Sequence, residues 1–427
     1  MKKFIALFLV LALSLFVAVG CAGENNNGEN GIYRDINGNE IDISLNIYRD
    51  PASPYPNYAE VAVIDPVKHP EAQDMGLFWL GIDEDGEVIE RRASTAEGAS
   101  LVNPDLPTVI TVHGLQFNGG HRSPERFKVS SSIVCDYASF GVEEGNLDMS
   151  VLVLNHGHNV ANFYWHRFAA DEPNATEKKI WSKDGAGGVS YKLPNEKFNK
   201  GEDFDFSVAE FFVGEYLRAI KLIEGFGANE IRIAGHSMGT PLVTATAFIL
   251  TELVRTKALH KSLIPNRIAL LDGFLGIVML NVSLPAQRTT LSWTGKPHVK
   301  RSSSETLLAC LNALNNSGVA VEFYYLYNGI TAKWAGNTID RIHEVSAFVT
   351  LYPDLKTENN NYKFADDGHG AVRLWYYSSI VFPPVGQSVP SGGASSEAIR
   401  GFLGKKFIQT GGTTTLFTGD DIFESDD

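Results

Sequence analysis

Short apolar runs, bounded by proline, glycine and polar residues, alternate with amphipathic stretches along this chain. Residues 107–115 (PTVITVHGL) form a β-branched run typical of a strand that is buried on both faces of a parallel sheet. Similar runs follow at 149–154, 266–272, 319–327 and 345–352. Strands that alternate with helices predict one doubly wound, mostly parallel α/β sheet with helices on both faces and right-handed crossovers.

The flanks of this pattern are less regular. Residues 41–47 alternate apolar and polar side chains, and 83–86 (DEDG), which follow the apolar run 76–82, are typical of a hairpin turn. We expect a helix at 124–140. Residues 155–205 break the rhythm, and we interpret them as an insertion or irregular crossing segment within the same domain.

The best-marked helix precedes a short apolar strand at 231–234. Ser207 and Glu210 form a capping-box pattern, and an apolar stripe with helical spacing follows them. The strand then runs into residues 235–239 (GHSMG), and a mostly apolar helix is expected over 241–256.

Strand, Gly-x-Ser-x-Gly and helix in this order are what a nucleophile elbow requires. Gly235 and Gly239 suit a turn so tight that side chains there would collide with neighbouring backbone. The turn would hold Ser237 in a strained conformation with its Oγ exposed. The pattern predicts Ser237 as a catalytic nucleophile; the alternative is a plain glycine-rich turn after a strand.

A serine hydroxyl needs a base at hydrogen-bond distance, and the base needs an acid that orients it. In the chain order Ser, acid, His, the candidate base is His369, in a polar, glycine-containing stretch after the last predicted strand. We expect that stretch to be a loop. His343, directly before an apparent strand, competes with His369, which could instead be a loop histidine paired with a neighbouring aspartate.

Three motifs together carry a family resemblance: residues 113–115 (HGL), 235–239 (GHSMG) and 369–380 (HGAVRLWYYSSI). They resemble the α/β-hydrolase lipases, most nearly the pancreatic and lipoprotein lipase branch, whose catalytic histidine is likewise followed by an arginine, an aromatic cluster and Ser-Ile. The resemblance spans about 105–380 and implies an α/β-hydrolase fold that hydrolyses lipids or similar acyl esters.

The resemblance also bears on the acid. In the lipase branch the acid follows the strand after the elbow helix, where this chain has Asp272, although the family usually has proline at the position of Gly273. In most other α/β-hydrolases the acid follows one strand later, where this chain offers Asn328 and, further on, Asp340. Asp272 is the candidate acid and Asp340 the runner-up; Asp272 could also be a simple strand-end cap.

Attack on an ester places negative charge on the carbonyl oxygen, which preorganised N–H groups must receive. Met238, next to the nucleophile, offers one by its position, and the family motif places the second on Leu115. His113 is expected to shape this loop, and Gly114 to let the backbone approach the substrate. Residues 274–280 (FLGIVML) would line an acyl site, belong to a lid reaching Trp293, or form an ordinary buried helix.

Composition narrows the function classes. The 427 residues are 44% hydrophobic, enough for a large core, and the formal net charge of −14 argues against a nucleic-acid partner. His156 and His158 lack a third ligand at a suitable spacing, and there is no glycine-rich phosphate loop. We therefore predict no cofactor and no metal.

Cys135 and Cys310 fall in apolar helical stretches, which favours unpaired core thiols over a disulfide.

Residues 1–20 combine two lysines, an apolar core and small residues before Cys21, which resembles a bacterial lipoprotein signal. Such a signal implies export and lipidation of Cys21, anchoring the protein to a bacterial membrane on its periplasmic or cell-surface side. Ordinary cleavage or a retained anchor helix is the alternative, but the apolar run is short for a membrane span.

The remaining chain divides into three parts. Residues 21–32 are polar and indicate a flexible tether, 33–387 one hydrolase domain, and 388–427 a C-terminal extension with a linker at 391–396 and an acidic tail.

The sequence thus predicts a lipid-anchored, serine-dependent carboxylic ester hydrolase, lipase-like or a carboxylesterase. A serine peptidase or thioesterase on the same fold, or a surface binding lipoprotein without catalysis, remains the alternative.

Overall fold

The computed structural model describes residues 33–34, 40–41, 55–116, 149–183, 188–195, 197–199, 204–276, 279–280, 301–327, 338–352, 365–412 and 418–426. Several predicted features lie outside these ranges: Cys21, the tether at 21–32, the helix at 124–140 with Cys135, Trp293 and Asn328. Within these ranges no helix has the length and hydrophobicity needed to cross a bilayer.

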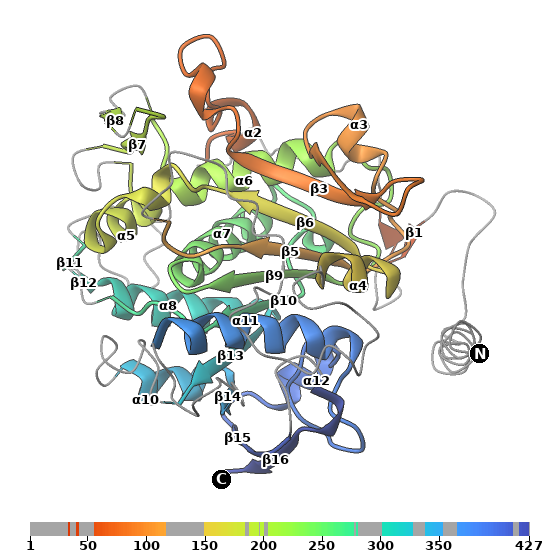
Figure 1. Cartoon of the computed structure of the whole chain (residues 1–427). Helices are drawn as coiled ribbons and strands as arrows, with labels where there is room; N and C mark the ends of the chain where they lie inside the picture. The colour runs from red at the N-terminus through yellow and green to blue at the C-terminus, as the bar shows by residue number, and fades with distance from the viewer. Residues whose placement is uncertain are drawn as a thin grey trace.

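A ten-stranded sheet organises the described part of the chain (Figure 1). In spatial order its strands are β4 (Val88–Arg92), β3 (Gly76–Ile82), β6 (Asn159–Tyr164), β5 (Thr108–Val112), β9 (Ile231–His236), β10 (Arg267–Leu271), β13 (Ala320–Leu326), β14 (Ala347–Leu351), β15 (Lys406–Gly411) and β16 (Ile422–Ser425). Neighbours from β6 to β15 pair in parallel, whereas β3, β4 and β16 pair antiparallel at the edges.

Helices cover both faces of this sheet. One face carries α5 (Pro173–Trp181), α6 (Val208–Ile220), α7 (Gly239–Arg255) and α8 (Ser303–Asn316), with α2 (Tyr58–Val61) against α6. The other carries α4 (Met149–Asn155), α11 (Ala365–Val381) and α12 (Ser396–Gly401). Two short helices, α3 (Ala96–Ala99) and α10 (Thr338–Ile342), complete the described α-helices. Three two-stranded ribbons complete the described strands: β1 (Tyr33–Arg34) with β2 (Glu40–Ile41), β7 (Tyr191–Lys192) with β8 (Phe198–Asn199), and β11 (Met279–Leu280) with β12 (Arg301–Ser302). Short 3-10 turns lie at Pro70–Ala72, Phe168–Ala170, Lys261–Leu263, His343–Val345 and Thr418–Asp420.

The two-sided burial explains why the strands have continuous apolar sequences. Successive strand side chains point to opposite faces. In β10, Ile268 and Leu270 enter the core beneath α6 and α7, while Ala269 and Leu271 enter the core beneath α4 and α11. The predicted doubly wound, mostly parallel sheet is therefore confirmed.

The capping box that begins α6 is also confirmed. The Ser207 hydroxyl accepts the Glu210 N–H at 3.2 Å, and the Glu210 carboxylate accepts the Ser207 N–H at 2.7 Å. These two bonds satisfy donors that a helix N-terminus leaves unpaired, so the start of α6 is fixed locally.

The predicted strand at 149–154 is wrong. Those residues form α4, and the strand beside β5 is instead β6, inside the stretch expected to be irregular. A short apolar run fits a strand or a buried helix equally well, so the run itself does not decide. In α4 the buried positions include Met149 and Val153, four residues apart on one helical face.

The predicted linker at 391–396 is a packed loop leading into α12. Ser391 is buried, and the guanidinium groups of Arg232 and Arg267 donate to the Gly392 carbonyl. Small residues are required here, because a Cβ on Gly392 would collide with the backbone of Tyr376. Beyond this loop, β15 and β16 extend the main sheet.

Candidate active site

The turn between β9 and α7 is as tight as the sequence indicates. Ser237 occupies it with φ of 54°, a left-handed conformation that is costly for a residue other than glycine. A Cβ on Gly235 would lie 2.5 Å from the Gly239 carbonyl oxygen, and one on Gly239 would lie 2.6 Å from that of Val112. Both glycines are therefore required by sterics.

Backbone hydrogen bonds fasten this turn to the end of β10. The Ser237 N–H donates to the Leu271 carbonyl at 3.0 Å, and the Phe274 N–H donates to the Ser237 carbonyl at 2.9 Å. Asp272 lies between these two partners along the chain. The turn and the candidate acid are thus held together by main chain, independently of side-chain rotamers.

The carboxylate of Asp272 lies against the imidazole of His369. Asp272 Oδ2 is 2.5 Å from His369 Nδ1, and Oδ1 accepts the Leu326 N–H at 3.3 Å. Asp272 is fully buried and has φ of 40°. Three non-glycine residues in the described ranges have positive φ, and two of them are Ser237 and Asp272. Backbone strain of this kind concentrates at functional sites.

Gly273, which directly follows the candidate acid, lies too close to the elbow helix for a side chain. A Cβ at this position would lie 2.7 Å from both Cγ2 and Oγ1 of Thr240, in the first turn of α7. Only glycine lets the chain after the acid pass so close to the elbow helix.

His369 lies in the first turns of α11, so the prediction of a loop at this position is wrong. The glycines on either side of His369 suggested a loop, but two acidic residues near a helix N-terminus are equally typical of a helix start. The helix begins at Ala365 and brings the imidazole over the carboxyl ends of the strands.

Among the described residues, no hydrogen bond joins Ser237 Oγ to the His369 imidazole. The elbow and the start of α11 are in contact through the neighbouring residue: His236, which directly precedes Ser237, donates from Nε2 to the His369 carbonyl at 2.9 Å and places its ring 4.4 Å from that of His369. Catalytic hydrogen bonds are often long in substrate-free sites and tighten on binding.

The competing candidates lie apart from this constellation. Asp340 is exposed on α10, and His343 lies in the 3-10 turn that follows it. Within the described ranges, neither contacts His369 or Ser237. Asp272 is thus the candidate acid that the structure brings to His369.

The loop after β5 touches the candidate nucleophile. A Cβ on Gly114 would lie 2.7 Å from Ser237 Cβ, so glycine is required for this approach. His113 Nδ1 is 2.8 Å from the Gly114 carbonyl, and Nε2 accepts the Trp165 N–H at 3.2 Å. One donating and one accepting nitrogen correspond to a neutral imidazole that shapes the loop.

Within the described residues, the N–H groups of Leu115 and Met238, which are expected to receive the oxyanion, donate no backbone hydrogen bond. The neighbouring N–H groups are bonded: Gln116 donates to the Ala169 carbonyl and Ser237 to the Leu271 carbonyl. Met238 also immediately precedes α7, where the helix dipole favours negative charge.

Sequence reasoning missed two titratable groups with shifted pKa values, one of which lies beside His369. Burial, with His369 and Arg373 nearby, holds the pKa of His236 well below its usual value. Burial raises the pKa of Glu177 to about 7, and the Glu177 carboxylate lies where a Cβ on Gly276 would be, two residues beyond Phe274. His236 lies inside the GHSMG motif and so carried a sequence signal, whereas Glu177 carried none.

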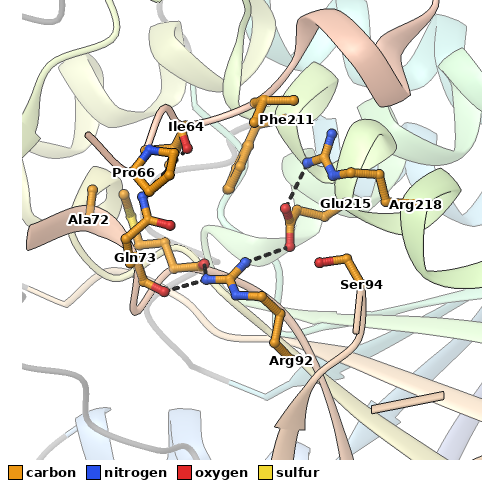
Figure 2. Close-up of a pocket in the computed structure, with 11 residues that line it drawn as sticks. Ile64, Pro66, Ala72, Gln73, Arg92, Ser94, Phe211, Glu215 and Arg218 are labelled. Atoms are coloured by element: carbon orange, nitrogen blue, oxygen red, sulfur yellow. Dashed lines mark hydrogen bonds and ion pairs between the residues drawn. The ribbon is translucent and has the colours of Figure 1, made fainter. Parts of the chain in front are cut away.

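A small pocket elsewhere on this molecule is already occupied by paired charges (Figure 2). Arg92 and Arg218 both bind the Glu215 carboxylate, and Arg92 also donates to the carbonyls of Gln73 and Met75. None of its lining residues belongs to the Ser237, Asp272 and His369 constellation.

The described residues contain no cluster of three or more side chains suited to a metal ion. The rings of His156 and His158 stack at 5.8 Å, and burial lowers the pKa of His158 to about 4. Cys310 is fully buried in α8, as expected of a core cysteine.

The tight turn at Ser237 lies between a strand and a helix, at the carboxyl ends of a mostly parallel sheet with helices on both faces. This arrangement is the α/β-hydrolase fold.

No family model and no curated protein matches the chain. Among solved structures, it is similar to a lipase/esterase from Lactobacillus plantarum, at 8% identity and a TM-score of 0.29 over 62% of this chain and 85% of that one. It is also similar to Est1E from Butyrivibrio proteoclasticus, at 12% identity and a TM-score of 0.23 over 59% and 77%. Residue roles therefore rest on the geometry of this chain.

Proposed function

We propose that this chain is a serine-dependent carboxylic ester hydrolase that works through an acyl-enzyme. The observation that carries the proposal is the buried Asp272 carboxylate, 2.5 Å from His369 Nδ1 and beside the strained Ser237. A nucleophile, a base and an acid that meet on one sheet edge have the roles that acyl transfer requires.

In the first half-reaction, Ser237 Oγ attacks the ester carbonyl while His369 Nε2 takes the hydroxyl proton. Asp272 accepts a hydrogen bond from Nδ1–H, which fixes the tautomer and stabilises the imidazolium. The N–H groups of Leu115 and Met238 receive the negative charge on the former carbonyl oxygen. When the tetrahedral intermediate collapses, the imidazolium gives its proton to the departing alcohol.

In the second half-reaction water replaces the alcohol. His369 takes a proton from water, the hydroxide attacks the acyl-enzyme carbonyl, and Ser237 Oγ leaves with the proton returned by His369. The products are a carboxylic acid and the free enzyme. Neither half-reaction draws on a metal or a cofactor.

The finer proposal is a lipase-like preference for apolar acyl groups. Phe274, whose N–H binds the Ser237 carbonyl, and Leu275, which is 1% exposed, place apolar side chains in the chain segment next to the nucleophile. The same triad serves peptidases and thioesterases, so the acyl group must be identified by assay.

Ser237→Ala tests the chemistry. We expect loss of p-nitrophenyl acetate and butyrate hydrolysis with an unchanged circular dichroism spectrum, because the substitution removes only Oγ. Ser100→Ala, on a helix cap far along the chain, is the matched control and should keep full activity. If Ser237→Ala is as active as Ser100→Ala, the proposal is wrong.

A substrate panel tests the lipase-like preference. p-Nitrophenyl esters of increasing chain length, compared below and above their micelle concentrations, would give rising kcat/KM with length and activation at the interface. Highest turnover on acetate with no interfacial activation identifies a carboxylesterase, and preferred cleavage of thioesters or amide bonds identifies the alternatives.

We also propose that Cys21 carries lipid and anchors the hydrolase outside the cytoplasm, on the basis of the sequence of residues 1–21. Expression with an alkyne-tagged fatty acid should label the wild type, and Cys21→Ser should abolish the label and move the protein from the membrane to the aqueous fraction. Equal labelling of both proteins would contradict lipidation at Cys21.

A further inference from the structure

His236 has no role in the chemistry proposed above, although it directly precedes the nucleophile. Its side chain is buried at the end of β9 and faces α11. Nε2 lies 2.9 Å from the His369 carbonyl oxygen, and the two rings are 4.4 Å apart between centroids at 41°. His236 thus holds both the backbone and the ring face of the candidate base.

The surroundings of His236 keep it neutral. The groups that face it are the imidazoles of His369 and His113 and the guanidinium of Arg373, and burial in this setting opposes a further positive charge. The His369 carbonyl can only accept, so the single proton of the neutral ring lies on Nε2. Within the described residues His236 Nδ1 has no hydrogen-bond partner, so Nε2–H is the ring's one polar contact there.

The imidazole of His369 is consequently held at two points. Asp272 binds its Nδ1 edge, and His236 fixes the main chain from which the side chain extends. His236 ends β9 and Asp272 directly follows β10, and these two strands are hydrogen-bonded neighbours in the sheet. The sheet therefore determines where the His369 ring can lie.

We propose that His236 is a positioning residue for His369: its Nε2–H keeps the base oriented so that Nδ1 stays on Asp272 while Nε2 faces Ser237. It acts through His369 and does not touch the substrate. The inference rests on the proposed function, because it assigns His236 a task only if His369 is the base.

Two substitutions separate the hydrogen bond from the ring. His236→Gln keeps an N–H donor near the position of Nε2, whereas His236→Phe keeps a ring that packs on His369 but donates nothing. We expect His236→Gln to retain a kcat close to that of the wild type. We expect His236→Phe to lower kcat by about ten- to a hundredfold with little change in KM, because small misplacement of a catalytic group is costly while substrate binding is untouched.

A spectroscopic readout tests the orientation directly. The Nδ1–H between His369 and Asp272 should give a low-field proton resonance in the wild type and in His236→Gln, and a broadened or missing one in His236→Phe. A merely structural role for His236 would leave this resonance unchanged in any folded variant. If His236→Phe fails to fold by circular dichroism, His236→Met takes its place as the variant without a donor.

The outcomes distinguish this inference from the function on which it rests. If the wild type and His236→Gln do not hydrolyse esters and Ser237 does not react with a fluorophosphonate, the proposed function fails. If the wild type is active but the donor-free variant retains both kcat and the resonance, the positioning role of His236 fails alone. Equal losses in His236→Gln and His236→Phe would also overturn it.

Discussion

Asp272→Asn removes one charge from the centre of the proposed site and changes almost no volume. The Leu326 N–H donates to Asp272 Oδ1 at 3.3 Å, so an asparagine would keep its carbonyl oxygen on that donor. Its NH2 group would then face His369 Nδ1, which is 2.5 Å from Oδ2 in the native site. The imidazole must accept this bond, so its proton moves to Nε2, and Nε2 can no longer take the proton of Ser237.

The loss should be large because the carboxylate is fully buried and, among the described residues, is the acid that bonds the His369 imidazole. A wrong tautomer with intact geometry costs about 10³- to 10⁴-fold in kcat, which corresponds to about 4–5.5 kcal/mol of transition-state stabilisation. KM for p-nitrophenyl butyrate should change little, since Asp272 does not reach the substrate. Steady-state kinetics together with a thermal melt separate this effect from unfolding.

Asp340→Asn is the matched control, since Asp340 is the runner-up acid and is exposed on α10. We expect it to keep wild-type kcat. If Asp272→Asn retains more than a tenth of the activity, or if Asp340→Asn loses it, the assignment of the acid is refuted.

Three further predictions concern stability. Gly273→Ala should lower the free energy of unfolding by about 1–3 kcal/mol, because its Cβ would lie 2.7 Å from two atoms of Thr240. Denaturant melts measure this loss, and the double variant with Thr240→Ala should recover part of it. Arg267→Met should cost about 3–5 kcal/mol in the same assay, because it leaves the fully buried Glu322 carboxylate, 3.3 Å from the guanidinium, without its cation. Burial raises the pKa of Glu177 from 4.5 to about 7. Between these pH values the folded state holds a proton that the unfolded chain releases. The free energy of unfolding should therefore fall by about 3 kcal/mol as the pH rises from 4.5 to about 7. Glu177→Gln should remove this fall and raise the melting temperature at about pH 8 but not at about pH 4.5; an unchanged pH dependence would contradict it.

The parts of the fold that could be predicted are those whose cause is local. The elbow can be predicted because contacts within and beside the turn require Gly235 and Gly239. The start of α6 can be predicted because Ser207 and Glu210 form a capping box. Such requirements leave specific residue types at specific positions. Sequence alone therefore placed Ser237 between a strand and a helix.

The parts that were missed depend on tertiary context. Residues 149–154 fit a strand or a helix until the packing of β6 beside β5 is known. The 391–394 loop has the composition of a linker, yet Arg232 and Arg267, far away in sequence, bury it. Nothing in the local sequence of Glu177 indicates that it lies against Gly276.

The choice between Asp272 and Asp340 shows the same limit at the site. Both fit an acid that follows a strand after the elbow, and spacing along the chain does not separate them. Hydrogen bonding in the sheet separates them, because Ser237 N–H binds Leu271 and so fixes Asp272 beside the elbow.

The proposed chemistry depends above all on Ser237 being an activated nucleophile. Treatment of the purified protein with a fluorophosphonate, followed by peptide mass spectrometry, tests it most directly. We expect one phosphonyl adduct on Ser237, formed rapidly in the wild type and far more slowly in Asp272→Asn. An unlabelled Ser237 in a protein that still hydrolyses esters, or an adduct on a different serine, would contradict it.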